Sequence, residues 1–317
     1  MEIVVLDAAT LGEDISLLPL EKTGSTVIYK TTLKEEVKNR IQTADVVVLN
    51  KVVLNEENLK YAKNLKLICI TATGYDNVDV SYCQKRGIAV CNVKGYSTDS
   101  VSQVTVAMVL SLITHVKEYR DYVKSGQYTK SGLHNYLKPV YHELSSMTWG
   151  IIGLGNIGRK TAKIAKAFGC RVICSKRTPD TEFETVDIDT LIEKSDIITV
   201  HVPLNNETKN LINKDRIAKM KKTAVFVNVA RGAVADEAAL AAAIKQKRLG
   251  AIGIDVYEKE PLCENHPYYD IINYDNVCLM PHMAWGAHEA RERCIKEIAE
   301  NIKAFFAGEI RNRVDLI

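Results

Sequence analysis

The stretch Thr148-Trp-Gly-Ile-Ile-Gly153-Leu-Gly155-Asn-Ile-Gly158, continued by the helical pattern 159–169, decides the fold. It predicts a strand, a tight glycine turn and a helix, in that order. Gly153 permits the turn, Gly155 lets the backbone approach a pyrophosphate, and Gly158 allows close packing of helix on strand. The helix N-terminus adds free N–H groups and a positive dipole end. We predict dinucleotide binding here; a plain strand–helix turn or another ligand of such folds, such as a methyl donor, is the alternative.

The next strand, 171–174, runs into Ser175-Lys176-Arg177-Thr178. A protein that binds NAD usually has Asp or Glu here, because that carboxylate accepts hydrogen bonds from the ribose 2′-OH. A carboxylate would repel a 2′-phosphate, whereas two cations and two hydroxyls would bind one. We therefore predict that NADP(H) is preferred over NAD(H), with Arg177 as the main phosphate ligand. The alternative is a solvated basic turn.

Short β-branched runs alternate with longer helical patterns along most of the chain, which indicates parallel βαβ units. Further strands are expected at 2–6, 45–49, 66–70, 88–91, 196–200, 224–228, 250–254 and 276–280. Several are apolar throughout, as expected when helices cover both faces of a parallel sheet. Two helix starts are expected as well, because Thr32 to Glu35 fits a capping box and Asp236 opens an alanine-rich run.

The longest helical pattern begins near Ser100 and is followed by a polar, tyrosine-rich stretch to about Leu144. A helix of this length between two sets of strands suggests a connector between domains. The last helix, at about 287–307, has apolar residues every four positions. It follows all the strands, so we expect it to pack back on the first domain.

Composition bounds the class of protein. The 317 residues are 46% apolar and 26% charged, with a formal net charge of +3, as in a globular protein of about two domains. So small a charge gives no reason to expect nucleic acid as a partner. The eight cysteines show no metal-ligand spacing, which predicts free thiols in a reducing compartment and no metal. We expect neither a signal peptide nor a membrane span, and hence a cytoplasmic protein.

Three successive strands each end in a chemically active residue. Arg231 follows the strand 224–228, Asp255 and Glu260 follow 250–254, and His282 follows 276–280. Each alone is more often a surface residue at a strand end. Because parallel strands deliver such residues to the same sheet edge, where α/β folds bind ligands, the three together predict an active site.

With these segments in place, the chain resembles the D-isomer-specific 2-hydroxyacid dehydrogenases over essentially its whole length. The matching segments are Ala72-Thr-Gly-Tyr-Asp-Asn-Val-Asp79, the glycine motif, His201-Val-Pro-Leu204 with Thr208, Asn228-Val-Ala-Arg-Gly232, Asp255 to Pro261, and Pro281-His282. Segments 95–103 and 281–285 look most like glycerate dehydrogenase and hydroxypyruvate reductase members. Lys176-Arg177 departs from the acidic residue typical of NAD-using members, which puts NAD in doubt but not the family.

The resemblance implies an α/β protein of two Rossmann-like domains with parallel sheets. A substrate-binding domain, 1–99 and 283–317, would be split by a dinucleotide-binding domain, 100–282. Members are commonly homodimers, joined largely through the cofactor domain and the segment after residue 100.

The resemblance also implies the chemistry, which is hydride transfer between NAD(P)H and C2 of a small 2-oxo or D-2-hydroxy acid. Arg231 would hold the substrate, His282 would move the proton, and Glu260 would favour the charged imidazole. Backbone N–H groups at Thr73 and Gly74 would bind the substrate carboxylate, with Arg231 and His282. The implied cofactor-binding residues are Gly153, Gly155, Asn156, Ile157, Gly158, Ser175, Lys176, Arg177, His201, Val202, Pro203, Thr208, Ala230 and Asp255.

Several alternatives stay open at this point. Hydroxypyruvate or glyoxylate is the expected substrate; the competitors are a phosphoglycerate dehydrogenase-like enzyme and a non-catalytic dinucleotide-sensing regulator on the same fold. Asn50-Lys51 either approaches the substrate cleft or forms a surface loop. Trp285 either narrows the substrate pocket or is an ordinary packing residue.

Overall fold

The computed structural model describes residues 1–316. The chain forms two compact units, Met1–Ser97 with Trp285–Ile317, and Thr98–Ala284. The second unit therefore interrupts the sequence of the first. Both are α/β structures whose sheets contain only parallel strand pairs among the residues described, so the predicted fold class is confirmed.

The first unit contains a five-stranded sheet in the order β2-β1-β3-β4-β5. Its strands are β1 Glu2–Val5, β2 Ser25–Ile28, β3 Val46–Leu49, β4 Leu67–Ile70 and β5 Ala89–Cys91. Its helices and 3-10 turn are η1 Ala8–Leu11, α1 Leu18–Glu21, α2 Val37–Arg40, α3 Glu56–Leu59, α4 Val80–Arg86 and α12 His288–Phe306.

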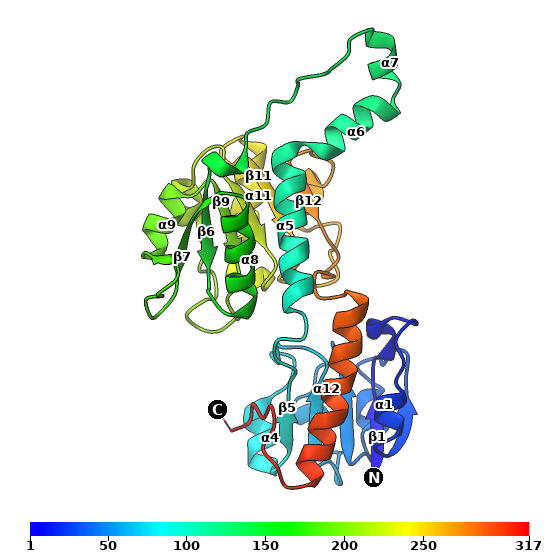
Figure 1. Cartoon of the computed structure of the whole chain (residues 1–317). Coiled ribbons are helices and arrows are strands. Elements are labelled where there is room, and N and C mark those ends of the chain that lie inside the picture. The colour runs from blue at the N-terminus through cyan, green and yellow to red at the C-terminus, as the bar shows by residue number, and fades with distance from the viewer. Residues whose placement is uncertain (317) are drawn as a thin grey trace. The chain divides into compact units, whose positions relative to one another are not determined.

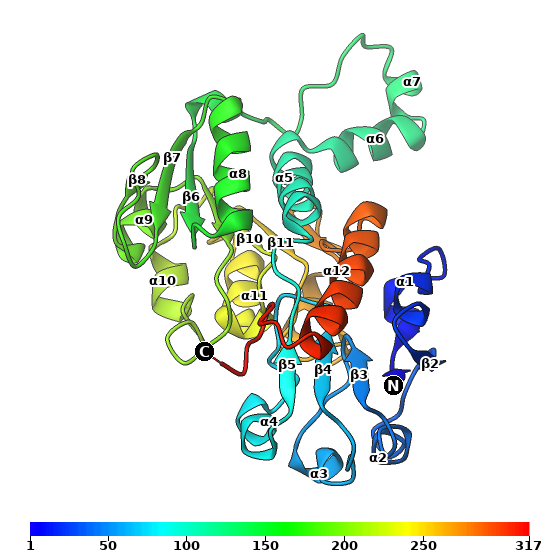
Figure 2. The ribbon, with the colours of Figure 1, turned by 60° about the horizontal axis from the view of Figure 1, so that its bottom comes forward.

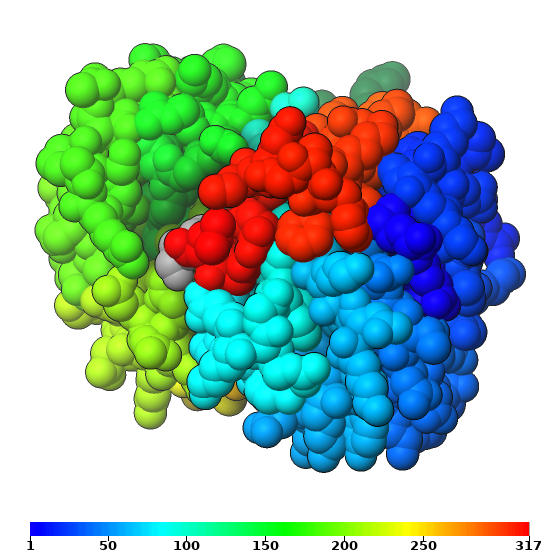
Figure 3. All heavy atoms as spheres, turned by 90° about the horizontal axis from the view of Figure 1, so that it is seen from below, coloured from blue at the N-terminus to red at the C-terminus, as the bar shows by residue number. Residues whose placement is uncertain are grey.

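Helix α12 packs on this first sheet, as predicted for the last helix. Its apolar face joins the core formed by alternate residues of β1 and β3. Figure 2 shows α12 running along the sheet, and the space-filling view in Figure 3 shows its orange to red surface beside the blue N-terminal segment that contains α1.

The second unit contains a seven-stranded sheet in the order β12-β11-β10-β9-β6-β7-β8. Its strands are β6 Thr148–Ile152, β7 Arg171–Ser175, β8 Glu184–Thr185, β9 Ile197–Val200, β10 Val225–Asn228, β11 Ala251–Ile254 and β12 Val277–Leu279. Its helices and 3-10 turns are α5 Thr98–Thr114, α6 Val116–Lys124, α7 Gln127–Ser131, η2 Leu144–Ser146, α8 Asn156–Ala167, α9 Ile188–Lys194, α10 Lys214–Lys219, η3 Gly232–Val234, α11 Glu237–Lys245 and η4 Pro267–Ile271.

Helices cover both faces of this second sheet. Alternate residues of β6 enter opposite cores: Trp149 and Ile151 pack with α5 and α8, whereas Ile152 packs with α9, α10 and α11. The strands are apolar throughout for this reason. Because all strand pairs in this sheet are parallel, the predicted catalytic and cofactor-binding residues that follow β6, β7, β9, β10, β11 and β12 lie at the carboxyl ends of its strands.

The long helical pattern is broken in two. α5 ends at Thr114, and His115, at φ 54°, caps the separate helix α6. Figure 1 shows α6 and α7 standing away from the sheet of the second unit, and neither helix contains a buried residue. Within residues 1–316 no single helix is long and apolar enough to span a bilayer. The bent pair α5–α6 is long and apolar enough only when its two helices are taken together.

Two details of the fold differ from the prediction. The short strands β2 and β8 were not predicted, because both lie at sheet edges and β2 is largely exposed, which leaves little hydrophobic pattern. The capping box at Thr32 was wrong: the helix begins at Val37, and the Thr32 hydroxyl instead donates to the Leu6 carbonyl oxygen. Asp236 does cap α11, accepting from Ala239 N at 2.9 Å.

Candidate active site

The glycine turn between β6 and α8 is packed too closely for side chains. Gly153 has φ +90°, and a Cβ there would lie 2.8 Å from the His201 carbonyl oxygen. A Cβ on Gly158 would lie 2.0 Å from the Gly153 carbonyl oxygen. A Cβ on Gly155, by contrast, would meet nothing within 4 Å. The turn is a tight cradle with one position open to solvent, as a pyrophosphate requires.

The first turn of α8 supplies donors beside this cradle. The helix begins with Asn156 and Ile157, and Gly155 caps it without a side-chain hydrogen bond. The N–H groups of a first helical turn have no partner within the helix, and the dipole end is positive. Cradle and helix end together fit the pyrophosphate of a nicotinamide dinucleotide.

The end of β9 forms a second wall of the cradle. Val202 lies against the turn, since a Cβ at Gly153 would meet Val202 Cγ1 at 2.7 Å. The loop that follows is fixed by Thr208, whose hydroxyl donates to the Pro203 carbonyl oxygen at 2.6 Å. These residues shape the cradle by packing and backbone contacts.

His201 contributes an unpaired nitrogen to this wall. Its Nε2 lies 3.0 Å from Thr199 Oγ1, while its Nδ1 is buried without a hydrogen-bond partner in the part of the chain described. Burial lowers the pKa of His201 to about 3, so the ring is neutral. A buried nitrogen without a partner beside an open cradle is a second feature that fits a bound cofactor.

At the end of β7 each cation of the predicted basic turn has a carboxylate partner. Lys176 Nζ lies 3.3 Å from Asp180 Oδ2, and Arg177 Nη2 lies 2.5 Å from Glu207 Oε2. Ser175 ends the strand, and its carbonyl oxygen accepts from Gly153 N at 3.0 Å. The basic turn is thus joined to the glycine turn, and its charges are balanced locally.

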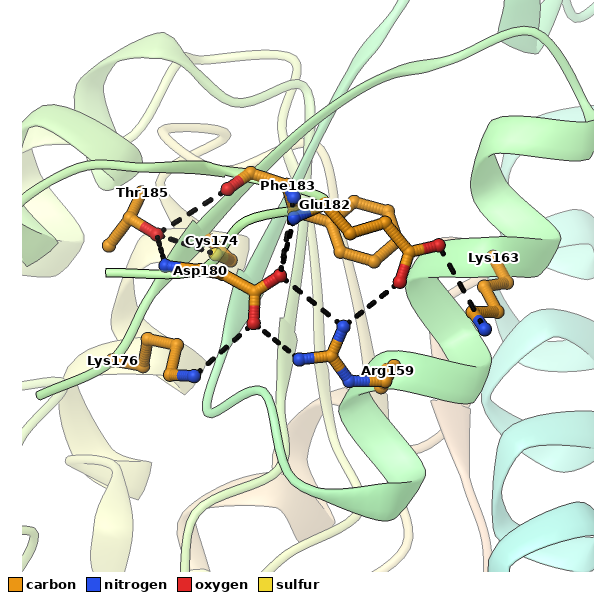
Figure 4. A network of polar contacts seen from close by, with 8 residues as sticks. All are labelled: Arg159, Lys163, Cys174, Lys176, Asp180, Glu182, Phe183 and Thr185. Atoms are coloured by element: carbon orange, nitrogen blue, oxygen red, sulfur yellow. Dashed lines mark hydrogen bonds and ion pairs between the residues drawn. The ribbon is translucent and has the colours of Figure 1, made fainter. Parts of the chain in front are cut away.

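Asp180 is the centre of a polar network that Figure 4 shows from close by. It accepts from the Arg159 guanidinium, which projects from α8, and from Glu182 N at 3.0 Å and Phe183 N at 3.3 Å. The Arg159 guanidinium, followed by the Glu182 N–H, holds the pKa of Asp180 well below its usual range. Asp180 ties the loop after β7 to the first turns of α8.

Arg231 follows β10 in a turn held by Asn228. The Asn228 amide donates to the Arg231 carbonyl oxygen at 2.9 Å and accepts from Ala230 N at 3.0 Å. A Cβ on Gly232 would lie 2.0 Å from Glu258 N. The absence of a side chain there lets this turn pack directly on the loop that carries Glu260.

Glu260 and His282 form a close pair across the ends of β11 and β12. The Glu260 carboxylate lies 2.7 and 2.8 Å from His282 Nδ1. The side chains are 30% and 18% exposed, so the pair is accessible without being fully solvated. Tyr257 N donates to Glu260 Oε1 at 3.1 Å, which fixes the carboxylate from behind.

The turn that holds His282, at φ 52°, is fixed on both sides. The buried Asp255 carboxylate accepts from Met283 N at 2.8 Å and Ala284 N at 3.0 Å. The Tyr257 hydroxyl donates to the Met280 carbonyl oxygen at 2.9 Å. Burial raises the pKa of Asp255, although the two N–H donors oppose the shift.

The family follows from comparison with known proteins. Residues 106–284 match the family model described as D-isomer specific 2-hydroxyacid dehydrogenase, NAD binding domain. The chain belongs to this family. The resemblance stated from sequence motifs is thereby confirmed, and the chain is a dehydrogenase that acts on CH–OH donors with a nicotinamide dinucleotide.

Three curated relatives cover most of this dehydrogenase. It is 35% identical to glycerate dehydrogenase of Methylorubrum extorquens, over 90% of the chain and 91% of the relative. It is 38% identical to glyoxylate reductase of Thermofilum pendens, over 87% and 83%. It is 34% identical to hydroxypyruvate reductase of Blautia hydrogenotrophica, over 99% and 100%.

Solved structures agree with the fold of the dehydrogenase. D-lactate dehydrogenase of Aquifex aeolicus, complexed with NAD and lactic acid, matches with a TM-score of 0.89 at 29% identity, over 99% of both chains. An acyclic imino acid reductase in complex with NADPH and D-Arg matches with a TM-score of 0.86 at 29% identity, over 99% and 100%. Both kinds of nicotinamide dinucleotide therefore occur among its structural neighbours.

The first unit of the dehydrogenase holds the remaining predicted residues. The Thr73 hydroxyl donates to the Val93 carbonyl oxygen at 2.8 Å, and Asn92 donates to the Thr73 carbonyl oxygen at 2.7 Å. Thr73 is exposed, and Gly74, which follows it, is half-buried. These contacts fix the backbone on which the predicted carboxylate-binding N–H groups lie.

The two residues with open alternatives also lie in the first unit. Asn50 is buried, donates to Thr10 Oγ1 at 3.1 Å, and its backbone N–H is bound by Asp7, whereas Lys51 is exposed. The Trp285 ring contacts Tyr96 edge to face, with centroids 6.3 Å apart. Within this unit, Asn50 and Trp285 both have structural contacts.

Three functional candidates were not predicted from the sequence: Asp180, Glu207 and Tyr257. Asp180 lies five residues beyond the end of β7, in no recognisable motif, and Glu207 reaches Arg177 from a different loop. Only tertiary structure brings these residues to the turn. Tyr257 lies within the predicted segment 255–261, but its hydroxyl contact with Met280 has no sequence signal.

Proposed function

We propose that this dehydrogenase reduces short, polar 2-oxo acids, hydroxypyruvate or glyoxylate, to D-2-hydroxy acids, and that the same residues serve the reverse oxidation. The 2.7 Å contact between His282 and Glu260 carries the proposal, because it pairs a proton carrier with a carboxylate at the sheet edge that also bears Arg231 and the glycine turn. Relatives at 34–38% identity are named glycerate dehydrogenase, glyoxylate reductase and hydroxypyruvate reductase, which supports the substrate class.

His282 is the proton carrier. A bound nicotinamide supplies or accepts the hydride at C2 of the substrate. Because an ionised carboxylate only accepts hydrogen bonds, its contact with Glu260 keeps a hydrogen on Nδ1 of His282. Nε2 then donates the proton to the substrate carbonyl oxygen in reduction and removes it from the hydroxyl in oxidation. The charge of Glu260 stabilises the ring while it carries both protons.

Arg231 orients the substrate. A guanidinium offers two parallel donors, which suit a carboxylate and an adjacent carbonyl oxygen. We also propose the backbone N–H groups of Thr73 and Gly74 as substrate-binding groups, and residues 1–99 with 283–317 as the substrate-binding domain. Residues 100–282 are assigned to the dinucleotide, with Asp255 near the nicotinamide amide.

For the cofactor, we propose NADP(H) over NAD(H). The turn after β7 presents Lys176 and Arg177 where a carboxylate would mark an NAD enzyme. Arg177 is 79% exposed, so its side chain is free to turn toward a phosphate, whereas Lys176 is 27% exposed and held by Asp180. Charged hydrogen bonds of about 1.5–3 kcal/mol, discounted for exposure, give a preference of about 10- to 10³-fold.

One kinetic panel tests both assignments. The purified enzyme is assayed with hydroxypyruvate, glyoxylate, pyruvate, a branched and an aromatic 2-oxo acid, and 3-phosphohydroxypyruvate, each with NADPH and with NADH. We expect the highest kcat/KM with hydroxypyruvate or glyoxylate and with NADPH. A clear preference for a bulky or phosphorylated acid refutes the substrate proposal, and no turnover of any acid favours a regulator. Equal or better use of NADH refutes the cofactor proposal alone.

We also propose that the dehydrogenase is a homodimer. Its subunits would be joined through an arm, residues 116–147, which contains α6, α7 and the segment between α7 and β6. The arm exposes large apolar side chains, and Tyr122 stacks on Tyr136 with ring centroids 3.9 Å apart. Those exposed by more than half are Val116, Val123, Leu133, Leu137, Val140 and Tyr141. So many exposed apolar side chains in one short segment favour an interaction surface there. Light scattering of wild type and of Leu137→Glu should show a dimer and a weakened dimer.

Finally, we propose that the protein works in the cytoplasm. All eight cysteines are free thiols, and six of them are buried, so the fold is stabilised without a disulfide. Free thiols persist in a reducing compartment. Fractionation of cells that produce the protein tests this directly: recovery outside the cytoplasm would contradict it.

A further inference from the structure

The two cations of the turn after β7 are paired with carboxylates that differ in solvent exposure. Asp180, the partner of Lys176, is 5% exposed. Glu207, the partner of Arg177, is 72% exposed. This contrast decides which cation can exchange its partner for a phosphate.

Lys176 is held by Asp180, whose carboxylate has no free hydrogen-bond acceptor position. Oδ1 of Asp180 accepts from Glu182 N, Phe183 N and Arg159 Nη1, and Oδ2 accepts from Arg159 Nη2 and Lys176 Nζ. A carboxylate has about four lone-pair positions, so Asp180 is saturated. It therefore cannot take the place of the missing NAD-type carboxylate by accepting from a ribose 2′-OH, and it keeps Lys176 in one place (Figure 4).

Arg177 is held by one exposed carboxylate. The guanidinium and the Glu207 carboxylate are 79% and 72% exposed. Exposed ion pairs of this kind contribute little to stability and exchange readily. Of the two cations, Arg177 is the one that a 2′-phosphate can recruit, and Glu207 is the group that the phosphate must displace.

The acid itself cannot move far. Asn205 Oδ1 accepts from Glu207 N at 2.9 Å and from Thr208 N at 3.0 Å. The Thr208 hydroxyl in turn binds the Pro203 carbonyl oxygen. The backbone of Glu207 is thus anchored on the loop that continues the β9 wall of the cradle, so its exposed carboxylate can leave the Arg177 guanidinium but is carried by a fixed point of the loop.

We propose that Glu207 is a specificity-determining residue that competes with the 2′-phosphate for Arg177 and so limits the preference for NADP(H). This inference rests on the assignment of Arg177 to the phosphate. With NAD(H), which lacks the phosphate, the Arg177–Glu207 pair stays intact. With NADP(H), the guanidinium must be shared or exchanged, and Glu207 also repels the phosphate.

The test is equilibrium binding to Glu207→Gln, which keeps the side-chain shape and removes the charge. NADPH, NADH and adenosine 2′,5′-bisphosphate are titrated against wild type and variant at about 50 mM and about 300 mM salt. We expect NADPH and the bisphosphate to bind about two- to tenfold more tightly to the variant, as the loss of an exposed pair plus a repulsion predicts. NADH should change less than about twofold, and the gain should shrink at high salt.

Glu184→Gln is the matched control. Glu184 also pairs with an exposed arginine, Arg171, but at the opposite end of β7. It changes net charge equally and should leave all three affinities unchanged. Melting temperatures of both variants confirm that they are folded.

Two results overturn the inference. One is unchanged or weaker binding of NADPH to Glu207→Gln. The other is a gain that persists when Arg177 is also replaced by Gln, because the competition would then not act through Arg177. A wild type that prefers NADH refutes the proposed cofactor preference but not this inference, which is judged only by the ratio of variant to wild type.

Discussion

The two halves of the sheet in the second unit differ in how firmly they hold their proposed functional residues. The residues proposed for chemistry follow β10, β11 and β12, and those proposed for cofactor choice follow β6, β7 and β9. In the first half, Glu260 and His282 are fixed by backbone donors and acceptors on several sides. In the second, Arg177 is exposed and bound by one exposed acid. Proton transfer needs a fixed distance, whereas selection between two cofactors needs a contact that can be exchanged.

The contrast also predicts where substitutions are costly. A substitution in the catalytic half removes a group that no neighbouring side chain can replace, because the reacting atoms must be aligned. A change at the exposed turn alters cofactor affinity only by the small energy of a solvated ion pair. The expected effects therefore fall steeply from one half of the sheet to the other.

The largest effect is expected for His282→Ala. Loss of a positioned general acid should lower kcat with hydroxypyruvate by about 10²–10⁴-fold. NADPH affinity, measured by fluorescence titration, should change little, since the cofactor cradle lies in the other half. His288→Ala removes an exposed histidine paired with Asp14 and serves as the control. Turnover near that of wild type would remove His282 from the mechanism.

Arg231→Lys should be the next most severe change. An ammonium cannot reproduce the two-point fork, and loss of orientation costs about 10²-fold in kcat/KM. Arg248→Lys is a suitable control, because the Arg248 guanidinium donates to backbone carbonyls, including that of Met220 at 2.9 Å, away from the strand ends of the site. If both the rate and the substrate affinity of Arg231→Lys survive, the proposed anchor is wrong.

The two halves also differ in how much of each could be predicted from the sequence. The positions of Arg231, Glu260 and His282 at one edge could be predicted, because parallel strands deliver strand-end residues to a common edge. The glycine turn was predictable for a different reason, which is the spacing of Gly153, Gly155 and Gly158 between a strand pattern and a helix pattern. The partners of the basic turn were not, since Asp180 and Glu207 belong to irregular loops whose approach depends on tertiary packing. Exposed edge strands such as β2 escape prediction because they carry no alternation of apolar and polar residues.

His201, whose Nδ1 is buried, differs from the exposed Arg177 of the cofactor half. Its pKa in the fold is about 3 against 6.5 in the unfolded chain. Between these values the unfolded chain binds a proton that the folded chain does not, so stability is lost as pH falls from about 6.5 toward about 3, at up to about 1.4 kcal/mol per pH unit. Urea unfolding of wild type and His201→Gln from pH 7 to pH 4.5 measures this slope. The variant should lose less stability on acidification, and parallel curves would contradict the assignment.

The smallest effect is expected for Tyr257→Phe, which tests whether the catalytic half is as tightly fixed as its contacts imply. The hydroxyl donates to the Met280 carbonyl oxygen, two residues before His282. Burial raises the pKa of Tyr257, so the donor keeps its hydrogen at any working pH. Phe retains the ring and its edge contact with Tyr268, so the substitution removes the hydrogen bond alone.

Removal of that bond should lower the free energy of unfolding by about 0.5–1.5 kcal/mol. It should also lower kcat by about tenfold or less, since a full 1 Å displacement of a catalytic group costs about 10²-fold. The KM for the cofactor should not change, because the cradle lies at the other half of the sheet. Tyr269→Phe, at a ring that is 43% exposed, controls for loss of a hydroxyl in the same segment. A Tyr257→Phe variant equal to wild type in both stability and kcat would mean that the strand ladder and Asp255 alone hold the His282 turn.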